Sequence, residues 1–152
     1  MENCEFKRIK LEKPQLKGGI PLFEAFAKRK SQRDFDKNKF LSLSELSQLL
    51  WCGYGSNREG GFKVVPSAFH MNPLTIYCFM KCGTFKLSEE LEPIKEGDDR
   101  DLVAKLDYAK LAPLSLLIVA DLKKENPFTS TNIKLTDEIR KIISYVDAAH
   151  CC

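Results

Sequence analysis

The sequence predicts a single α+β domain over residues 1–152. Of these residues, 43% are hydrophobic and 30% are charged, which is ordinary for a globular protein with a real core. Helical and strand patterns follow one another without regular alternation, an order that favours α+β over a βαβ architecture. The chain shows no internal repeat and no low-complexity tract.

The first helix is predicted after a pair of glycines. Pro21 suits a first helical turn, and the apolar residues behind it recur at helical spacing. We therefore predict a helix over about residues 21–30 with a basic C-terminal end. Residues 31–40 are polar and are predicted to be irregular.

The second helix carries the clearest start signal in the chain. Ser42 and Glu45 form a capping box, in which the Ser hydroxyl and the Glu carboxylate each accept from the other residue's amide. Leucines follow at helical spacing. Gly53 and Gly55 are predicted to end this helix.

Two strands and a hairpin are predicted in the middle of the chain. Residues 74–81 are rich in β-forming side chains, and residues 84–87 read as their hairpin partner. Asp98 or Asp99 is placed to cap a short helix. Residues 114–120 are almost continuously apolar, which predicts a central strand covered on both faces.

Thr136 is placed to cap a last helix, whose apolar residues repeat at helical spacing between residues 139 and 149 and predict a core-facing stripe. The pattern is still apolar at Cys152, with no capping residue behind it. We therefore expect the 152 residues to be truncated from a longer protein.

Composition excludes several classes of function. The longest apolar run, residues 111–120, is about half of the roughly 20 residues that a membrane span needs, and no secretory signal is recognisable, so we expect a cytoplasmic protein without a membrane partner. Six cysteines without a C-x-x-C pair predict free thiols in a reducing compartment. With only two histidines, no metal site is predicted.

Basic side chains are concentrated between Lys28 and Lys39, where six Lys or Arg residues stand against Asp34 and Asp36. Such a local excess indicates either an anion-binding segment or a solvated helix end. A nucleic-acid-binding module is a third alternative, but the segment lacks interleaved aromatic residues and a groove-reading motif. We therefore predict no nucleic-acid partner.

Four stretches, taken in order, resemble the nitroreductase family of FMN enzymes. Residues 27–35 are similar to its Arg-Arg-Ser-x-Arg-x-Phe motif, and residues 43–55 to its Leu-Ser-x-Glu-Leu-x-x-Leu-Leu-Trp-Ala helix. Residues 65–68 resemble its Pro-Ser-Ala-Gly loop, and residues 145–150 the start of its buried Asp-x-Gly helix. The closest likeness is to the branch of thiazole and oxazole peptide dehydrogenases. The resemblance implies a nitroreductase-like fold, with a mainly antiparallel sheet flanked by helices.

The resemblance also implies a set of cofactor-binding residues. The FMN phosphate would be bound by Arg29, Lys30, Ser31 and Arg33, since guanidinium groups form bidentate, charge-assisted hydrogen bonds with phosphate. Pro66, Ser67 and Ala68 would lie along the flavin ring, and the Asn72 amide would meet its pyrimidine edge. Phe69 stands where the family has glycine, and a bulky residue adopts glycine's backbone angles only at a cost.

The implied function is an FMN-dependent oxidoreductase that takes a hydride from NAD(P)H and reduces an acceptor such as a nitroaromatic or quinone. Because the flavin performs this chemistry, we assign no catalytic side chain. The implied assembly is an obligate homodimer with flavin at the subunit interface. The alternative is a non-catalytic flavin-binding or interaction domain that has lost activity, which Phe69 and the absent C-terminal part of the family fold favour.

Overall fold

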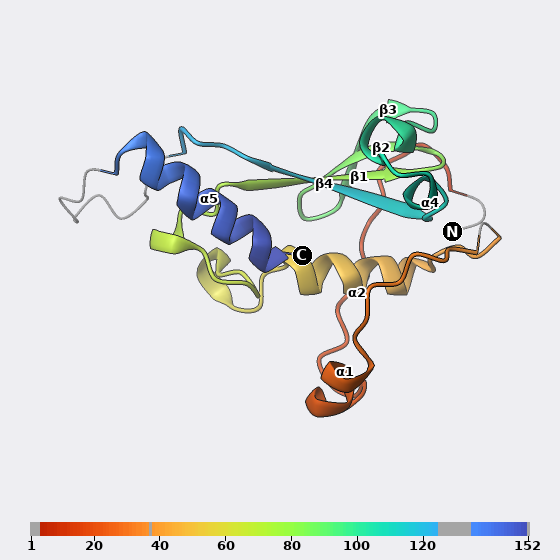
Figure 1. Cartoon of the computed structure of the whole chain (residues 1–152), viewed down its shortest axis with the longest axis horizontal. Coiled ribbons are helices and arrows are strands. Elements are labelled where there is room, and N and C mark those ends of the chain that lie inside the picture. The colour runs from red at the N-terminus through yellow and green to blue at the C-terminus, as the bar shows by residue number, and fades with distance from the viewer. Residues whose placement is uncertain (1–3, 37, 125–134, 152) are drawn as a thin grey trace.

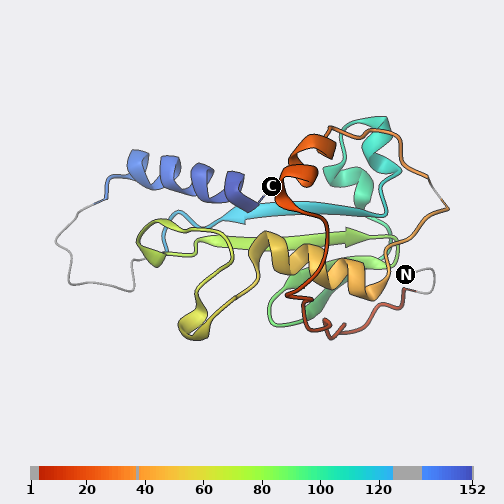
Figure 2. The ribbon, with the colours of Figure 1, turned by 90° about the horizontal axis from the view of Figure 1, so that it is seen from below.

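A four-stranded antiparallel sheet organises the chain, in the order β3-β2-β1-β4. The computed structural model describes residues 4–36, 38–124 and 135–151. Helix α2 lies across one face of the sheet, and α5 packs beside β4 near the C-terminal end of α2 (Figures 1 and 2). The sheet and α2 enclose the core, as the α+β prediction requires.

The elements alternate irregularly along the chain. The α-helices are α1 (Leu22–Lys28), α2 (Leu43–Tyr54), α3 (Arg100–Val103), α4 (Asp107–Lys110) and α5 (Asp137–Cys151). The short 3-10 helices are η1 (Glu59–Gly61) and η2 (Ala68–His70). The strands are β1 (Leu74–Met80), β2 (Gly83–Leu87), β3 (Leu91–Glu96) and β4 (Leu114–Ala120).

The core forms where α2 meets the sheet. Alternate side chains of β1 point towards α2, and Cys78 among them is fully buried. Phe85 of β2 and Leu91 of β3 are also fully buried. The remaining buried members of this cluster are Leu46, Leu50, Tyr54, Leu74, Ile76 and Met80.

Helix α2 confirms its sequence signal. The Ser42 hydroxyl accepts a hydrogen bond from the Glu45 amide at 3.1 Å, and the Glu45 carboxylate accepts one from the Ser42 amide at 2.7 Å. Of the two glycines predicted to end the helix, Gly55 is confirmed as the C-cap, whereas Gly53 lies inside the helix. Gly55 is extended there, and its amide donates to the Trp51 carbonyl at 2.8 Å.

The predicted hairpin of β1 and β2 is confirmed, and a strand that the sequence did not reveal continues it. In β3 the sequence Leu-Glu-Pro-Ile-Lys-Glu contains a proline and three charges, which hide the strand pattern. Pro93 is tolerated because β3 is an edge strand of the described sheet. The predicted helix after Asp98 is shorter than expected and ends at Val103.

Strand β4 is found where predicted, but its central position is wrong. It pairs only with β1, so it forms an edge of the described sheet. Leu116, Leu117 and Val119 are 40%, 40% and 42% exposed. A continuous apolar run shows that a strand needs cover, but it does not show whether the same chain provides it.

The cap of α5 is confirmed, and its predicted core-facing stripe is wrong. The Thr136 hydroxyl accepts a hydrogen bond from the Ile139 amide at 3.3 Å. Ile142 and Val146 are 61% and 49% exposed, whereas the polar Asp147 is only 3% exposed. The helix therefore buries the face that carries Asp147, which lies beside the apolar face that was predicted to be buried.

Cys4 and Cys82 are joined by a disulfide that ties the N-terminal segment to the turn between β1 and β2. The prediction of free thiols is wrong for these two residues and correct for Cys52 and Cys78. The paired cysteines are 78 positions apart, so their spacing carried no signal of the pairing.

Among the described residues, no helix is both long and apolar enough to cross a membrane.

Two glycines of α2 predict opposite effects on stability. A Cβ on Gly55 would lie 2.3 Å from the Trp51 ring, whereas one on Gly53 would make only an ordinary contact at 3.5 Å. Gly55→Ala should lower the free energy of unfolding by about 1–3 kcal/mol through overpacking. Gly53→Ala should raise it by up to about 1 kcal/mol through helix propensity. Urea unfolding of the two variants checks this, and equal effects would contradict it.

Candidate functional site

A buried carboxylate anchors the loop between α2 and β1. Asp147 of α5 accepts a hydrogen bond from the Ser67 hydroxyl at 2.6 Å and another from the Ala68 amide at 3.3 Å. Its side chain lies on the protein-facing side of α5 and is almost fully buried. The loop residues predicted to lie along a flavin are therefore fixed to a helix about 80 residues further along the chain.

The Ser67 hydroxyl also closes the loop on itself. It accepts a hydrogen bond from the Asn72 amide at 2.9 Å while it donates to Asp147. The Ser67 carbonyl accepts from the His70 amide at 3.1 Å, and the Ala68 carbonyl from the Met71 amide at 3.2 Å. One small side chain thus sets the shape of the loop as well as its position.

Three non-glycine residues of this loop have left-handed backbone conformations. The φ angles are 52° at Phe69, 54° at His70 and 44° at Asn72. Asn tolerates this region, but Phe does so only with strain of about 1–2 kcal/mol. Phe69 therefore adopts a backbone conformation that glycine takes freely, in the region where the sequence predicts a cost for a bulky residue.

A cavity of about 340 Å³ opens against the loop. Pro66, Ser67 and Asn72 line it together with the basic side chains of Arg58 and Lys63. The Arg58 guanidinium stands 5.0 Å from the centre of the Phe62 ring. Burial, followed by repulsion from Lys124, lowers the pKa of Lys63. The cavity accordingly combines small residues with positive charge.

The Asn72 side chain already has partners inside the loop. Its amide nitrogen lies 3.3 Å from the His70 carbonyl oxygen and 3.4 Å from the His70 Nδ1 atom. The backbone carbonyl of Asn72 accepts a hydrogen bond from the Lys124 ammonium at 2.6 Å. A contact between this amide and a ligand would therefore compete with contacts that shape the loop.

The predicted phosphate-binding residues lie elsewhere. Arg29, Lys30, Ser31 and Arg33 are all exposed, immediately after α1. Helix α1 and this segment project from the body of the protein, whereas the loop around η2 lies beneath α5 (Figures 1 and 2). Within the described part of the chain, no carboxylate pairs with the three basic side chains of this group. One chain does not bring the two predicted parts together.

Sequence analysis missed three residues of this region as site residues. Asp147 was placed in a buried motif but received no role, although a buried acid on an apolar helix is itself a signal. Arg58 and Lys63 carried no signal, because isolated basic residues in a polar loop are usually solvated. Only the folding of the loop reveals that they share a cavity.

Comparisons with known proteins agree with this architecture. The sequence profile of the nitroreductase family matches residues 26–151. A protein of Methanocaldococcus jannaschii, provisionally named a nitroreductase, is 33% identical over 118 residues, which cover 69% of this chain and 59% of the relative. A crystal structure of a provisionally named nitroreductase from Ralstonia eutropha JMP134 matches with a TM-score of 0.80 and 28% identity. That match covers 95% of this chain and 67% of the solved one.

The chain belongs to the nitroreductase family. The predicted nitroreductase-like α+β fold, with its antiparallel sheet and flanking helices, is confirmed. The chain spans 59% of the length of the curated relative that it matches.

Removing the Asp147 carboxylate should destabilise the protein strongly. Asp147→Ala leaves the partly buried Ser67 hydroxyl and the Ala68 amide without their acceptor, so the free energy of unfolding should fall by about 1–3 kcal/mol. Asp101→Ala removes an exposed carboxylate and should change it by less than about 0.5 kcal/mol. Urea unfolding measures both variants. Equal stabilities would show that the anchor contributes nothing.

The strain at Phe69 predicts an unusual order of stabilities. Phe69→Gly and Phe69→Ala both remove the ring, but only glycine accepts a φ of 52° freely. The Gly variant should therefore be more stable than the Ala variant by about 1 kcal/mol, against the usual order in an unstrained position. Thermal unfolding of the two proteins decides this, and an Ala variant of higher stability would remove the argument for strain.

Proposed function

We propose that the protein is an FMN-dependent oxidoreductase. Support comes from membership of the nitroreductase family together with the guanidinium groups of Arg29 and Arg33, which are exposed and form no ion pair with any described residue. When bound, FMN would take a hydride from NAD(P)H and pass electrons to a small acceptor such as a nitroaromatic or a quinone. The proposed role of the chain itself is to bind, orient and shield this cofactor.

The phosphate would be held by the segment after α1. Arg29 and Arg33 each offer a planar fork of donors that matches phosphate oxygens. Ser31 adds a hydroxyl donor, and Lys30 adds charge. All four residues are exposed, so the segment is accessible to a doubly charged group.

The ring would lie against the loop held by Asp147. Pro66 is exposed, and Ser67 and Ala68 have small side chains, so a planar group can approach the backbone there. Arg58 and Lys63 border the same cavity. Positive charge at this position would stabilise electron density on a reduced flavin.

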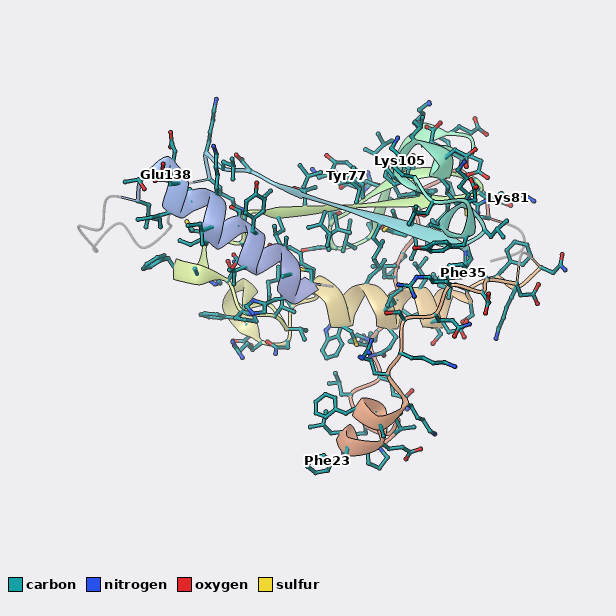
Figure 3. All side chains as sticks on the ribbon, viewed as in Figure 1. Phe23, Phe35, Tyr77, Lys81, Lys105 and Glu138 are labelled. Carbon is teal, nitrogen blue, oxygen red and sulfur yellow. A yellow bond between two sulfur atoms is a disulfide. The ribbon has the colours of Figure 1, made fainter. Side chains whose placement is uncertain are left out.

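The separation of these two parts supports a site shared between two copies of the chain. Apolar side chains that a dimer would cover are exposed on α1, where Phe23 is 83% exposed (Figure 3), and on α5, where Tyr145 is 73% exposed. Exposed apolar surface of this kind marks protein interfaces. We therefore propose a homodimer in which one FMN meets the phosphate segment of one protomer and the loop of the other.

The second candidate is a flavin-binding domain without catalytic activity. Phe69 favours it, because its ring is 40% exposed beside the loop and occupies space that glycine would leave open. Retention of FMN without oxidation of NAD(P)H in the presence of quinone would select this alternative.

Complementation between two variants tests the shared site. Arg29→Ala with Arg33→Ala removes the phosphate donors, and Ala68→Leu blocks the ring position. Each homodimer should lose FMN. Mixed dimers, isolated with two different affinity tags, contain one position with both parts intact and should hold about one FMN per dimer. They should also show about half of the wild-type rate of NADPH oxidation with quinone.

Two outcomes would contradict the proposal. Mixed dimers without flavin would mean that both parts act within one chain, or that neither binds FMN. A Lys10→Ala, Lys17→Ala protein serves as the matched control, since it also removes two exposed positive charges from the N-terminal part. If this control lost FMN equally, general charge would explain the effect.

A further inference from the structure

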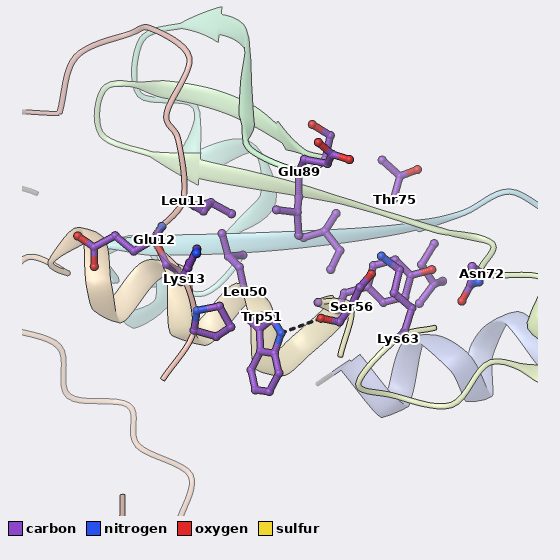
Figure 4. Close-up of a pocket in the computed structure, with 18 of the residues that line it drawn as sticks. Leu11, Glu12, Lys13, Leu50, Trp51, Ser56, Lys63, Asn72, Thr75 and Glu89 are labelled. Carbon is purple, nitrogen blue, oxygen red and sulfur yellow. Dashed lines mark hydrogen bonds between the residues drawn. The ribbon is translucent and has the colours of Figure 1, made fainter. Parts of the chain in front are cut away.

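A second and larger cavity, of about 640 Å³, lies between the N-terminal segment, α2 and the sheet (Figure 4). Its volume falls in the range of small-molecule sites. It shares Lys63 and Asn72 with the smaller cavity at the loop, but its other lining residues are separate. The proposed FMN function assigns no ligand to this space.

One end of the large cavity is basic. Lys63 and Lys124 both line it, and their ammonium groups are close enough for Lys124 to contribute to lowering the pKa of Lys63, after burial. Within the described chain, neither forms an ion pair. Figure 4 shows Lys63 and Asn72 at one end, well away from Glu12 at the other. An anion at the basic end would relieve the repulsion between the two lysines.

A buried phenol packs at the same end. Tyr54 lines the cavity and is 8% exposed, and its hydroxyl is shielded from solvent beside the Leu74 backbone. Burial raises the pKa of this phenol to about 12. The Lys63 ammonium lies 4.6 Å from the centre of the Tyr54 ring, which holds its charge at this end of the cavity.

The wall between the two ends is apolar and partly aromatic. The indole of Trp51 is fixed by a hydrogen bond from its Nε1 to the Ser56 carbonyl at 3.0 Å. Leu11, Pro14 and Leu50 extend this wall. Aromatic rings gain from offset or edge contacts with an indole.

We propose that this cavity binds an aromatic carboxylate. Its carboxylate would lie between Lys63 and Lys124, and its ring would pack against Trp51. The charge selects an anion, and the apolar wall selects an aromatic body. This binding needs neither flavin nor NAD(P)H, so it stands or falls independently of the proposed oxidoreductase function.

Trp51 is the single tryptophan of the chain and therefore reports directly on the cavity. Titration of the flavin-free protein with 4-nitrobenzoate should quench its fluorescence saturably. The neutral isostere 4-nitrobenzamide should bind roughly tenfold more weakly or worse, since it lacks the charge-assisted contacts. Similar affinities for the two compounds would overturn the proposal.

Three variants test the assigned residues. Lys63→Gln should weaken 4-nitrobenzoate binding roughly tenfold, whereas Lys105→Gln, which changes an exposed lysine outside the cavity lining, should not change it. Lys124→Gln should weaken binding by a similar factor, because the carboxylate is placed between the two lysines. If Lys63→Gln and Lys105→Gln bound alike, the assigned charge contact would be wrong.

Competition with FMN distinguishes the two cavities. If the sites are separate, FMN at saturating concentration leaves the affinity for 4-nitrobenzoate unchanged. If FMN displaces the carboxylate competitively, the large cavity is part of the flavin site, and the proposal of a separate ligand is overturned.

Discussion

The hydrogen bond between the buried Asp147 carboxylate and the partly buried Ser67 hydroxyl joins parts of the protein that are far apart in the sequence. A carboxylate with 3% exposure is stable only if the groups around it satisfy its oxygens, and the loop supplies both a hydroxyl and an amide. The same contact keeps three left-handed residues in place against their own preference. Strain of this kind persists only where the surrounding structure imposes it. The loop is therefore held in one shape, and its contact with α5 sets its position.

The basic and apolar surfaces of the chain can be described by where they lie relative to this loop. Positive charge from Arg58 and Lys63 borders it, whereas the basic segment after α1 lies elsewhere. Apolar residues on α1, β4 and α5 face outwards. A second copy of the chain would cover such surfaces and would also supply the missing half of the proposed cofactor site. Assembly and cofactor binding would then be one event.

Sequence reasoning succeeded where the signal was local. The capping box at Ser42 and the β-forming run of β1 depend on neighbouring residues, and both were predicted with nearly correct bounds. It failed where partners are distant, as for the edge position of β4 and the pairing of Cys4 with Cys82. The same holds for the site, because the motif residues were recognisable, but their separation in space was not. Which face of α5 is buried follows from packing that periodicity alone does not determine.

The most direct test of the cofactor assignment is gel filtration of the protein after incubation with FMN, with absorption recorded across the eluted peak. The account predicts that the band of oxidised flavin elutes with the protein, at a position corresponding to a dimer. A protein peak without that band, at any oligomeric state, would contradict the central claim and leave the family resemblance as a statement about fold alone.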